Sequence, residues 1–325
     1  MNLKKQTNWG IIGCGDVTER KSGPAYQKTE HFTIGAVMRR DEEKARDYAL
    51  RHNISKHYTD ADALINDPEI DAIYIATPPD THKYYGLKVA AAGKPCCIEK
   101  PMAPSYSDCV SICEAFENKG IPLFVAYYRR SLPRFLKIKE WIENDEIGDI
   151  RQIRWNLSKL ASEKDLSKEY NWRTDATIAP GGYFDDLASH GIDLFQYLLG
   201  DIIEVGGSSG NILGLYSAKD TIAASWKHHS GITGTGNWNF GCAEREDIVE
   251  IYGRKGKIVF SVFEEMPIQL IIENNITELI IAHPENIQLY HVANIREHLA
   301  GSILHPSTGR SAAHTNWVMD KILGN

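Results

Sequence analysis

The sequence has no apolar run that approaches the roughly 18 residues of a membrane-spanning helix. It also has no run of Lys and Arg, and its net charge of −7 argues against a nucleic-acid-binding surface. The polar residues 1–8 do not resemble a signal peptide. We therefore expect a cytoplasmic protein that binds neither membranes nor nucleic acids.

Metal-binding patterns are missing as well. The six cysteines form no C-x-x-C pair, and the twelve histidines include no H-E-x-x-H motif. We expect six reduced thiols and no metal site. The rest of the composition is that of an ordinary globular protein, 42% hydrophobic and 24% charged, and 325 residues are enough for two domains.

Residues 1–125 alternate between continuous apolar runs and helical patterns. We expect buried strands at 32–38, 70–77, 95–99 and 122–127, and helices at 18–29, 41–53, 60–66, 81–92 and 105–119. Such alternation predicts an α/β domain with a doubly wound parallel sheet, of the size usual for dinucleotide binding.

Residues 126–325 follow a different pattern, with helices expected at 134–144, 181–199, 290–300 and 311–323. Consecutive strand-like runs between residues 202 and 272, separated by tight turns, predict an α+β domain with a large, mostly antiparallel open sheet. An open sheet needs its second face covered, so we expect a homodimer or homotetramer built on that face.

A glycine-rich loop opens the chain. Gly10, Gly13 and Gly15 follow an apolar run in the spacing G-x-x-G-x-G, and Asp16 and Val17 lead into a helix. Bare glycines let a pyrophosphate approach backbone N–H groups at the start of a helix. The alternative is an ordinary strand-to-helix turn. The position of the loop, before a series of strands and helices, favours dinucleotide binding.

The end of the second strand faces the adenosine ribose in this kind of domain. A carboxylate there binds the 2′-hydroxyl of NAD, whereas arginine accommodates the 2′-phosphate of NADP. Arg39 and Arg40 stand at this point, and Asp41 is expected to cap the next helix. The pattern favours NADP(H) and leaves NAD(H) possible; the alternative is two solvated arginines at a strand edge.

Two further strand ends carry candidate cofactor-binding residues. Thr77, Pro78, Pro79 and His82 follow the strand at 70–77, and the prolines suit a stiff wall against the cofactor.

Glu99 and Lys100 follow the strand at 95–99, so both face the edge where open α/β sheets bind ligands. The ammonium group of Lys100 can bind a substrate hydroxyl and stabilise developing alkoxide.

Asp186 and His190 are four residues apart on the helix expected at 181–199. They therefore share one face, and a histidine beside a carboxylate suits general acid–base catalysis. Asp193 could orient the imidazole instead. The alternative is a helix histidine that is satisfied by a neighbouring acid.

Together these motifs resemble the glucose–fructose oxidoreductase, inositol dehydrogenase and MocA (Gfo/Idh/MocA) family. The resemblance rests on Gly10–Gly15, Glu99-Lys100-Pro101 and the stretch from Gly181-Gly182 to Asp193, in the family's order. It implies a Rossmann domain, an open-sheet domain and NAD(P)-dependent oxidation or reduction of sugars, polyols or related compounds. It also implies catalytic roles for Lys100, Asp186 and His190, with Tyr128, Trp172 and Arg173 near the substrate.

Two other functions stay open. The chain could be a dinucleotide-binding sensor without turnover, although such a sensor would not need Lys100, Asp186 and His190 together. It could also be a dihydrodiol dehydrogenase, or a reductase of a large planar ligand, on the same fold. Four tryptophans could line an aromatic pocket, although burial in a sheet core is the favoured explanation for them: Trp155, Trp172, Trp226 and Trp238.

Overall fold

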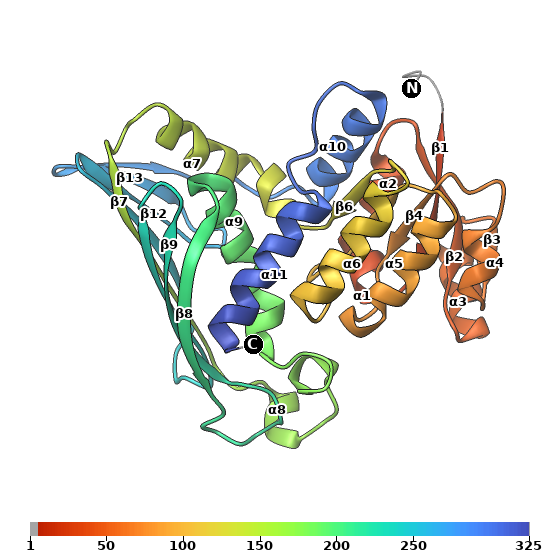
Figure 1. Cartoon of the computed structure of the whole chain (residues 1–325), viewed down its shortest axis with the longest axis horizontal. Coiled ribbons are helices and arrows are strands. Elements are labelled where there is room, and N and C mark those ends of the chain that lie inside the picture. Colours follow the sequence, from red (N-terminus) through yellow and green to blue (C-terminus); the bar gives the residue numbers. More distant parts are fainter. Residues whose placement is uncertain (1–5, 325) are drawn as a thin grey trace. The chain divides into compact units, whose positions relative to one another are not determined.

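The computed structural model describes residues 6–324 (Figure 1); residues 1–5, which begin the polar N-terminal stretch, lie outside it. The chain forms two compact units. The first contains the residues up to Ser131 and also Pro284–Ala313, and the second contains Leu132–His283 and the residues from His314 onward. The chain thus leaves the first unit after Ser131, six residues beyond the boundary suggested by the sequence, and later returns to it.

The first unit is built on a parallel six-stranded sheet with the strand order β3-β2-β1-β4-β5-β6. This confirms the doubly wound parallel sheet. The strand β1 lies in the middle, between β2 and β4, so the strand order reverses beside the glycine-rich loop. The strands are β1 (Thr7–Ile12), β2 (Phe32–Met38), β3 (Lys56–Tyr58), β4 (Ala72–Ile75), β5 (Cys96–Ile98) and β6 (Leu123–Val125).

Three helices of this unit begin after a residue whose side chain caps them. Asp41 accepts a hydrogen bond from the N–H of Lys44, as expected, and Ser105 caps the helix Tyr106–Glu117 in the same way. The helix expected at 18–29 is split in two, because Pro24 begins a new first turn. The helices are α1 (Asp16–Arg20), α2 (Gly23–Lys28), α3 (Glu42–Arg51), α4 (Ala61–Ile65), α5 (His82–Ala91), α6 (Tyr106–Glu117) and α10 (Leu289–Ala300), with 3-10 turns at Pro79–Thr81 and Tyr128–Ser131.

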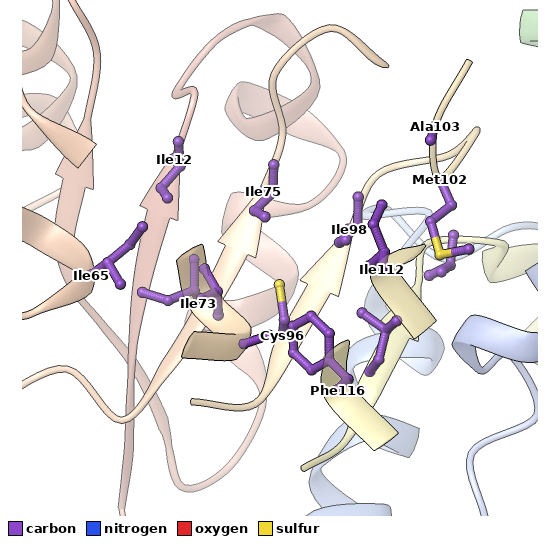
Figure 2. Close-up of a cluster of buried hydrophobic side chains, with 14 of the residues drawn as sticks. Ile12, Ile65, Ile73, Ile75, Cys96, Ile98, Met102, Ala103, Ile112 and Phe116 are labelled. Carbon is purple, nitrogen blue, oxygen red and sulfur yellow. The ribbon is translucent and has the colours of Figure 1, made fainter. Parts of the chain in front are cut away.

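Branched apolar side chains from neighbouring strands form the core of the first unit. Figure 2 shows Ile12, Ile75 and Ile98 on adjacent strands, with Ile112 and Phe116 of α6 packed against the sheet. Their burial explains the continuous apolar runs, since strands covered on both faces need apolar side chains on both faces. All six cysteines are free thiols, and five of them are buried.

The second unit contains an eight-stranded sheet with the order β14-β13-β12-β11-β7-β10-β9-β8. Its pairs are antiparallel except for β7 with β10, which confirms a large, mostly antiparallel sheet. The edge strand β14 was not expected, and its residues are largely exposed. The strands are β7 (Ile150–Lys159), β8 (Ile202–Gly210), β9 (Thr221–His228), β10 (Thr233–Phe240), β11 (Glu246–Gly253), β12 (Gly256–Phe260), β13 (Ile268–Ile272) and β14 (Asn275–Leu279).

One face of this sheet is covered by helices. Gly191 lies so close to Trp155 of β7 that an added Cβ would be 2.5 Å from the ring atom Cη2. The helix expected at 181–199 begins three residues later as a π-helical turn and continues as α9. The helices are α7 (Pro133–Glu143), α8 (Glu163–Ser167), the 3-10 turn Trp172–Thr174, the π-helical turn Phe184–Ala188, α9 (Ser189–Leu199) and α11 (Gly309–Leu323). Within residues 6–324, no helix has the length and apolar character needed to span a membrane.

Two buried histidines in the first unit predict that the free energy of unfolding falls in acid. His291 and His305 pack edge to face with ring centroids 4.7 Å apart. Burial, together with repulsion by His298 and Arg130, lowers the pKa of His305 to about 4. His305 stays neutral in the folded chain while the unfolded chain takes up a proton below about pH 6.5. We therefore expect the unfolding free energy to fall between pH 6.5 and pH 4, by about 3 kcal/mol for His305.

Urea unfolding of the wild type and of His305→Gln across this pH range measures the effect. The difference between the two curves isolates His305, because every other titrating group is present in both proteins. A wild-type curve that runs parallel to the variant curve from pH 7 to pH 4 would contradict the prediction.

Candidate functional site

The glycine-rich loop passes close to the end of β4. Gly13 has a φ of +93°, and an added Cβ would lie 2.7 Å from Cγ2 and 2.9 Å from N of Thr77. A side chain at this position would therefore clash with the neighbouring strand end. Around Gly15, by contrast, an added Cβ would meet no described atom within 4 Å. The loop is thus held against the sheet at Gly13 and open at Gly15. The third glycine, Gly10, lies within β1 and packs against Leu64.

Arg39 contacts the glycine-rich loop. Its guanidinium group donates a hydrogen bond to the carbonyl oxygen of Cys14 at 3.1 Å. Arg40 is exposed at the bend that follows, and Asp41 caps α3. The structure therefore brings Arg39, one of the two predicted arginines, to the glycine-rich loop. The neighbouring carboxylate of Asp41 caps α3 instead.

His82 connects two of the predicted cofactor-binding segments. The ring is fully buried, with Nε2 2.8 Å from the carbonyl oxygen of Thr77 and Nδ1 3.1 Å from that of Pro101. Burial lowers the pKa of His82, while the contacts with the carbonyl oxygens of Thr77 and Pro101 oppose that shift. The contacts fix the loop after β4, with Pro78 and Pro79, to the segment after β5. In this geometry His82 braces both segments.

Glu99 is held in place by residues far away in sequence. Its Oε1 accepts hydrogen bonds from the hydroxyl of Tyr74 at 2.6 Å and from Nε2 of Gln288 at 2.7 Å. Its Oε2 accepts the backbone N–H of Lys100 at 3.2 Å. The carboxylate thus anchors the backbone that carries the predicted catalytic lysine. No sequence pattern indicated Gln288, which precedes α10 and lies 189 residues after Glu99 in the chain.

The segment after β6 is buried within the first unit. The guanidinium group of Arg129 lies 5.0 Å from the ring centroid of Tyr128, and Arg130 donates to the carbonyl oxygen of Pro306 at 2.9 Å. Arg129 therefore lies beside Tyr128, while Arg130 fixes this segment to the returning residues of the first unit.

In the second unit, the structure brings together three predicted residues. Nε of Arg173 lies 3.1 Å from Oδ2 of Asp186, and the guanidinium carbon lies 4.3 Å from the ring centroid of Trp172. Asp186 lies in the π-helical turn and His190 in the first turn of α9. The ion pair therefore fixes the segment before the two glycines to the helix that carries His190.

Asp185, next to Asp186, has a pKa raised above that of an ordinary aspartate. Its Oδ2 accepts the backbone N–H of Gly181 at 2.8 Å. Burial raises its pKa to about 7, and the charges of Asp320 and Asp186 add to the shift. A carboxyl with a raised pKa therefore lies next to Asp186. Sequence reasoning did not single out this residue.

His190 is buried against Phe263, with the two rings at a centroid distance of 6.0 Å and nearly perpendicular. Phe263 is positioned in turn by Asp247, which accepts its backbone N–H at 2.7 Å and the indole N–H of Trp155 at 2.9 Å. Asp193, also buried, accepts a hydrogen bond from the hydroxyl of Thr315 at 3.3 Å. A network of buried polar groups thus supports the wall around His190.

Lys159 is a further polar residue near Asp186 that the sequence did not indicate. Its ammonium nitrogen lies 4.2 Å from the ring centroid of Tyr183. Burial lowers its pKa, while the charges of Asp165 and Asp186 oppose that shift. Only the fold reveals this residue, because strand β7 ends beside the π-helical turn.

Comparisons with known proteins identify the family of the chain. Residues 7–127 match the GFO/IDH/MocA oxidoreductase family with an NAD-binding Rossmann fold, and residues 135–259 match the GFO/IDH/MocA C-terminal domain. Oxidoreductase P35 of Formosa agariphila is 35% identical over 317 residues, which cover 97% of this chain and 94% of that protein.

Myo-inositol 2-dehydrogenase of Thermotoga maritima is 26% identical over 255 residues, covering 77% of this chain and 73% of that protein. The solved structure of a levoglucosan dehydrogenase in complex with NADH has a TM-score of 0.87 at 22% identity, covering 97% of this chain and 95% of the other. The chain belongs to the Gfo/Idh/MocA family of NAD-binding oxidoreductases.

Proposed function

We propose that the protein transfers a hydride between a nicotinamide cofactor and a secondary alcohol or carbonyl of a sugar, a polyol or a related compound. The observation that carries the proposal is the arrangement of Asp186 and His190 on successive helical turns, with Asp186 ion-paired to Arg173. The names of the relatives support the substrate class, since they include myo-inositol and levoglucosan dehydrogenases.

The proposed roles follow from the chemistry of each side chain. In the oxidative direction, His190 accepts the hydroxyl proton of the substrate as general base. The ammonium group of Lys100 donates a hydrogen bond to the same oxygen and lowers the free energy of its alkoxide character. Asp186, fixed by Arg173, positions the substrate or the imidazole. The bound nicotinamide supplies the hydride chemistry.

The test is a spectrophotometric screen. Purified protein is mixed with NADP⁺ or NAD⁺ and a panel of sugars and polyols, and the absorbance of the reduced nicotinamide is followed. We expect turnover of at least one polyhydroxy compound. A protein that binds the cofactor but oxidises and reduces nothing in the panel would instead support the sensor alternative.

The aromatic-pocket alternative is weakened by the packing of three tryptophans. Trp155, Trp226 and Trp238 are buried, and the Trp155 and Trp238 rings meet edge to face with centroids 5.5 Å apart. They fill the core between α9 and the sheet and do not line an open pocket. A planar aromatic substrate therefore gains no support from them.

For the cofactor, we propose a preference for NADP(H) over NAD(H). The first unit fits a dinucleotide, because Gly13 admits no side chain and the space around Gly15 is open. The guanidinium group of Arg39 lies at the loop where a 2′-phosphate would need a cation.

Arg39→Ala is expected to weaken NADPH binding roughly tenfold, since a hydrogen bond to a charged group contributes about 1.5–3 kcal/mol. NADH binding should change little. Dissociation constants of both cofactors from fluorescence titration measure the effect, with the exposed Arg46→Ala on α3 as control. Tighter binding of NADH than of NADPH by the wild type would contradict the preference.

We also propose that the free face of the second-unit sheet joins copies of the chain into a homodimer or homotetramer. Along β10, residues Thr233, Thr235 and Asn237 point away from the helix-covered face and are exposed. The six free thiols support the proposal that the protein works in the reducing cytoplasm.

A further inference from the structure

Lys159 is the last residue of β7 and stands on the face of the sheet that the helices cover. Side chains alternate between the two faces of a strand, and the three that precede Lys159 on its face, from Ile153 to Leu157, are apolar and buried. On this face Gly191, the residue after His190, packs against the ring of Trp155. The lysine therefore continues a row of core residues on the same side of the sheet as α9.

The ammonium group of Lys159 has no hydrogen bond and no carboxylate within ion-pair distance among residues 6–324. It lies over the ring of Tyr183 instead, 4.2 Å from the centroid. A ring face engages one side of an ammonium group, which carries three N–H donors. The side chain is only partly exposed, and burial lowers the pKa of Lys159. The loss of water thus outweighs the attraction of the acids nearby.

The acids near Lys159 are engaged with other groups. Against the effect of burial, the charges of Asp165 and Asp186 raise the pKa of Lys159, so both acids lie near its ammonium group. Asp186 is paired with Arg173. Asp165 accepts the hydroxyl of Tyr183 at 2.8 Å and belongs to a capping box at the start of α8. Lys159 is therefore left for an acceptor that these residues do not supply.

Two arginines also lie near Lys159. Burial lowers the pKa of Lys159 most, and repulsion by Arg245 and Arg173 lowers it as well. Arg245 directly precedes β11, the strand next to β7, and is paired with Glu264. Each arginine thus has a carboxylate partner, and the lysine between them has none in contact. A hydroxyl oxygen would satisfy one N–H of this ammonium group, whereas a carboxylate also compensates its charge.

We propose that Lys159 binds a carboxylate of the substrate, so that the enzyme acts on an acidic sugar such as a uronic or an aldonic acid. The reacting hydroxyl of this sugar lies at His190, and its carboxylate lies at the end of β7. The inference rests on the proposed function and narrows its substrate class.

The experiment compares ligands that differ only in a carboxylate in place of a CH₂OH group. Isothermal titration is carried out on the protein loaded with reduced cofactor, so that the alcohols bind without reacting. The pairs are glucuronate with glucose, galacturonate with galactose, and gluconate with glucitol. We expect at least one acid to bind tenfold or more tightly than its neutral counterpart, the usual effect of a hydrogen bond between charged groups. Added salt should reduce this preference.

Substitutions of Lys159 assign the preference to its charge. Lys159→Met keeps most of the length of the side chain and removes the ammonium group, and it should reduce the preference to less than threefold. Lys159→Arg keeps a cation and should retain a preference of threefold or more. Lys168→Met changes the net charge by the same amount at an exposed position of the second unit and should leave the preference unchanged.

Thermal unfolding separates binding from folding. Lys159→Met should not lower the Tm, because it removes a partly buried ammonium group that no acid contacts. Should this variant fail to fold, Lys159→Gln provides the same test with a shorter neutral side chain. A lower Tm together with an unchanged preference for the acid would assign Lys159 a packing role on Tyr183 and overturn the inference.

The outcomes also distinguish this inference from the proposed function. Turnover of neutral sugars, with no acid bound more tightly than its neutral counterpart, overturns the inference and leaves the proposed function intact. A preference for an acid that persists in Lys159→Met overturns the role of Lys159. Absence of turnover with every compound contradicts the proposed function, while an acid preference that Lys159→Met abolishes still supports the carboxylate site.

Discussion

Lys100→Met is expected to lower kcat by about 10²–10³-fold, the usual effect of removing one group that stabilises developing negative charge on oxygen. The substitution keeps the length and apolar character of the side chain and removes only the ammonium group. The backbone N–H of residue 100 still donates to Glu99, and Glu99 keeps its bonds to Tyr74 and Gln288. Folding should therefore be unaffected.

A second substitution, His190→Ala, removes the proposed general base. Its expected cost in kcat is about 10²–10⁴-fold. NADPH binding should stay close to that of the wild type in both variants. The loss in His190→Ala should be smaller at high pH, where hydroxide and substrate alkoxide replace the base.

Initial rates on a substrate found in the screen measure both effects, with fluorescence titration for NADPH. Lys119→Met, an exposed residue after α6, serves as the matched control. Wild-type turnover in both Lys100→Met and His190→Ala would refute the assigned roles, even if the protein proved to be a dehydrogenase.

Asp247→Ala is expected to lower the free energy of unfolding by about 3–5 kcal/mol, since each stranded buried donor costs about 1–3 kcal/mol. The buried carboxylate accepts bonds from the indole of Trp155, the hydroxyl of Ser261 and the N–H of Phe263. Its removal leaves these donors without their acceptor. Because Phe263 packs against His190, activity should fall as well.

Urea unfolding at pH 7 measures this loss. The matched control is Asp149→Ala, because Asp149 is exposed and its ion pair with Arg254 has an N–O distance of 3.7 Å. We expect the control to change stability by less than about 0.5 kcal/mol. Equal stabilities of Asp247→Ala and Asp149→Ala would show that the network contributes little.

The parallel sheet could be predicted from the sequence because each buried strand is a local signal. Apolar runs such as Phe32–Met38 stand between helical patterns, and Gly, Pro and Asp mark their ends. Apart from the edge strand β14, the strands of the second sheet were also readable from alternation and tight turns. The parallel pairing of β7 with β10 was not, since it joins strands about 80 residues apart and no local pattern encodes the partner.

The same limit applies to the candidate site. Residues that stand at strand ends or in motifs, such as Lys100 and His190, could be proposed from position and motif. Gln288, Lys159 and Asp165 were missed, because each acts through a contact that only the folded chain creates. The raised pKa of Asp185 was missed for a related reason, since it depends on burial rather than on residue type.

The return of Pro284–Ala313 to the first unit has a consequence for dissecting the protein. A nucleotide-binding fragment cut after Ser131 would omit α10, the Gln288 anchor of Glu99 and the buried imidazoles of His291 and His305. Residues 1–131 therefore do not make up the whole nucleotide-binding unit. A transfer of this unit to another protein, by evolution or by engineering, has to include residues 284–313 as well.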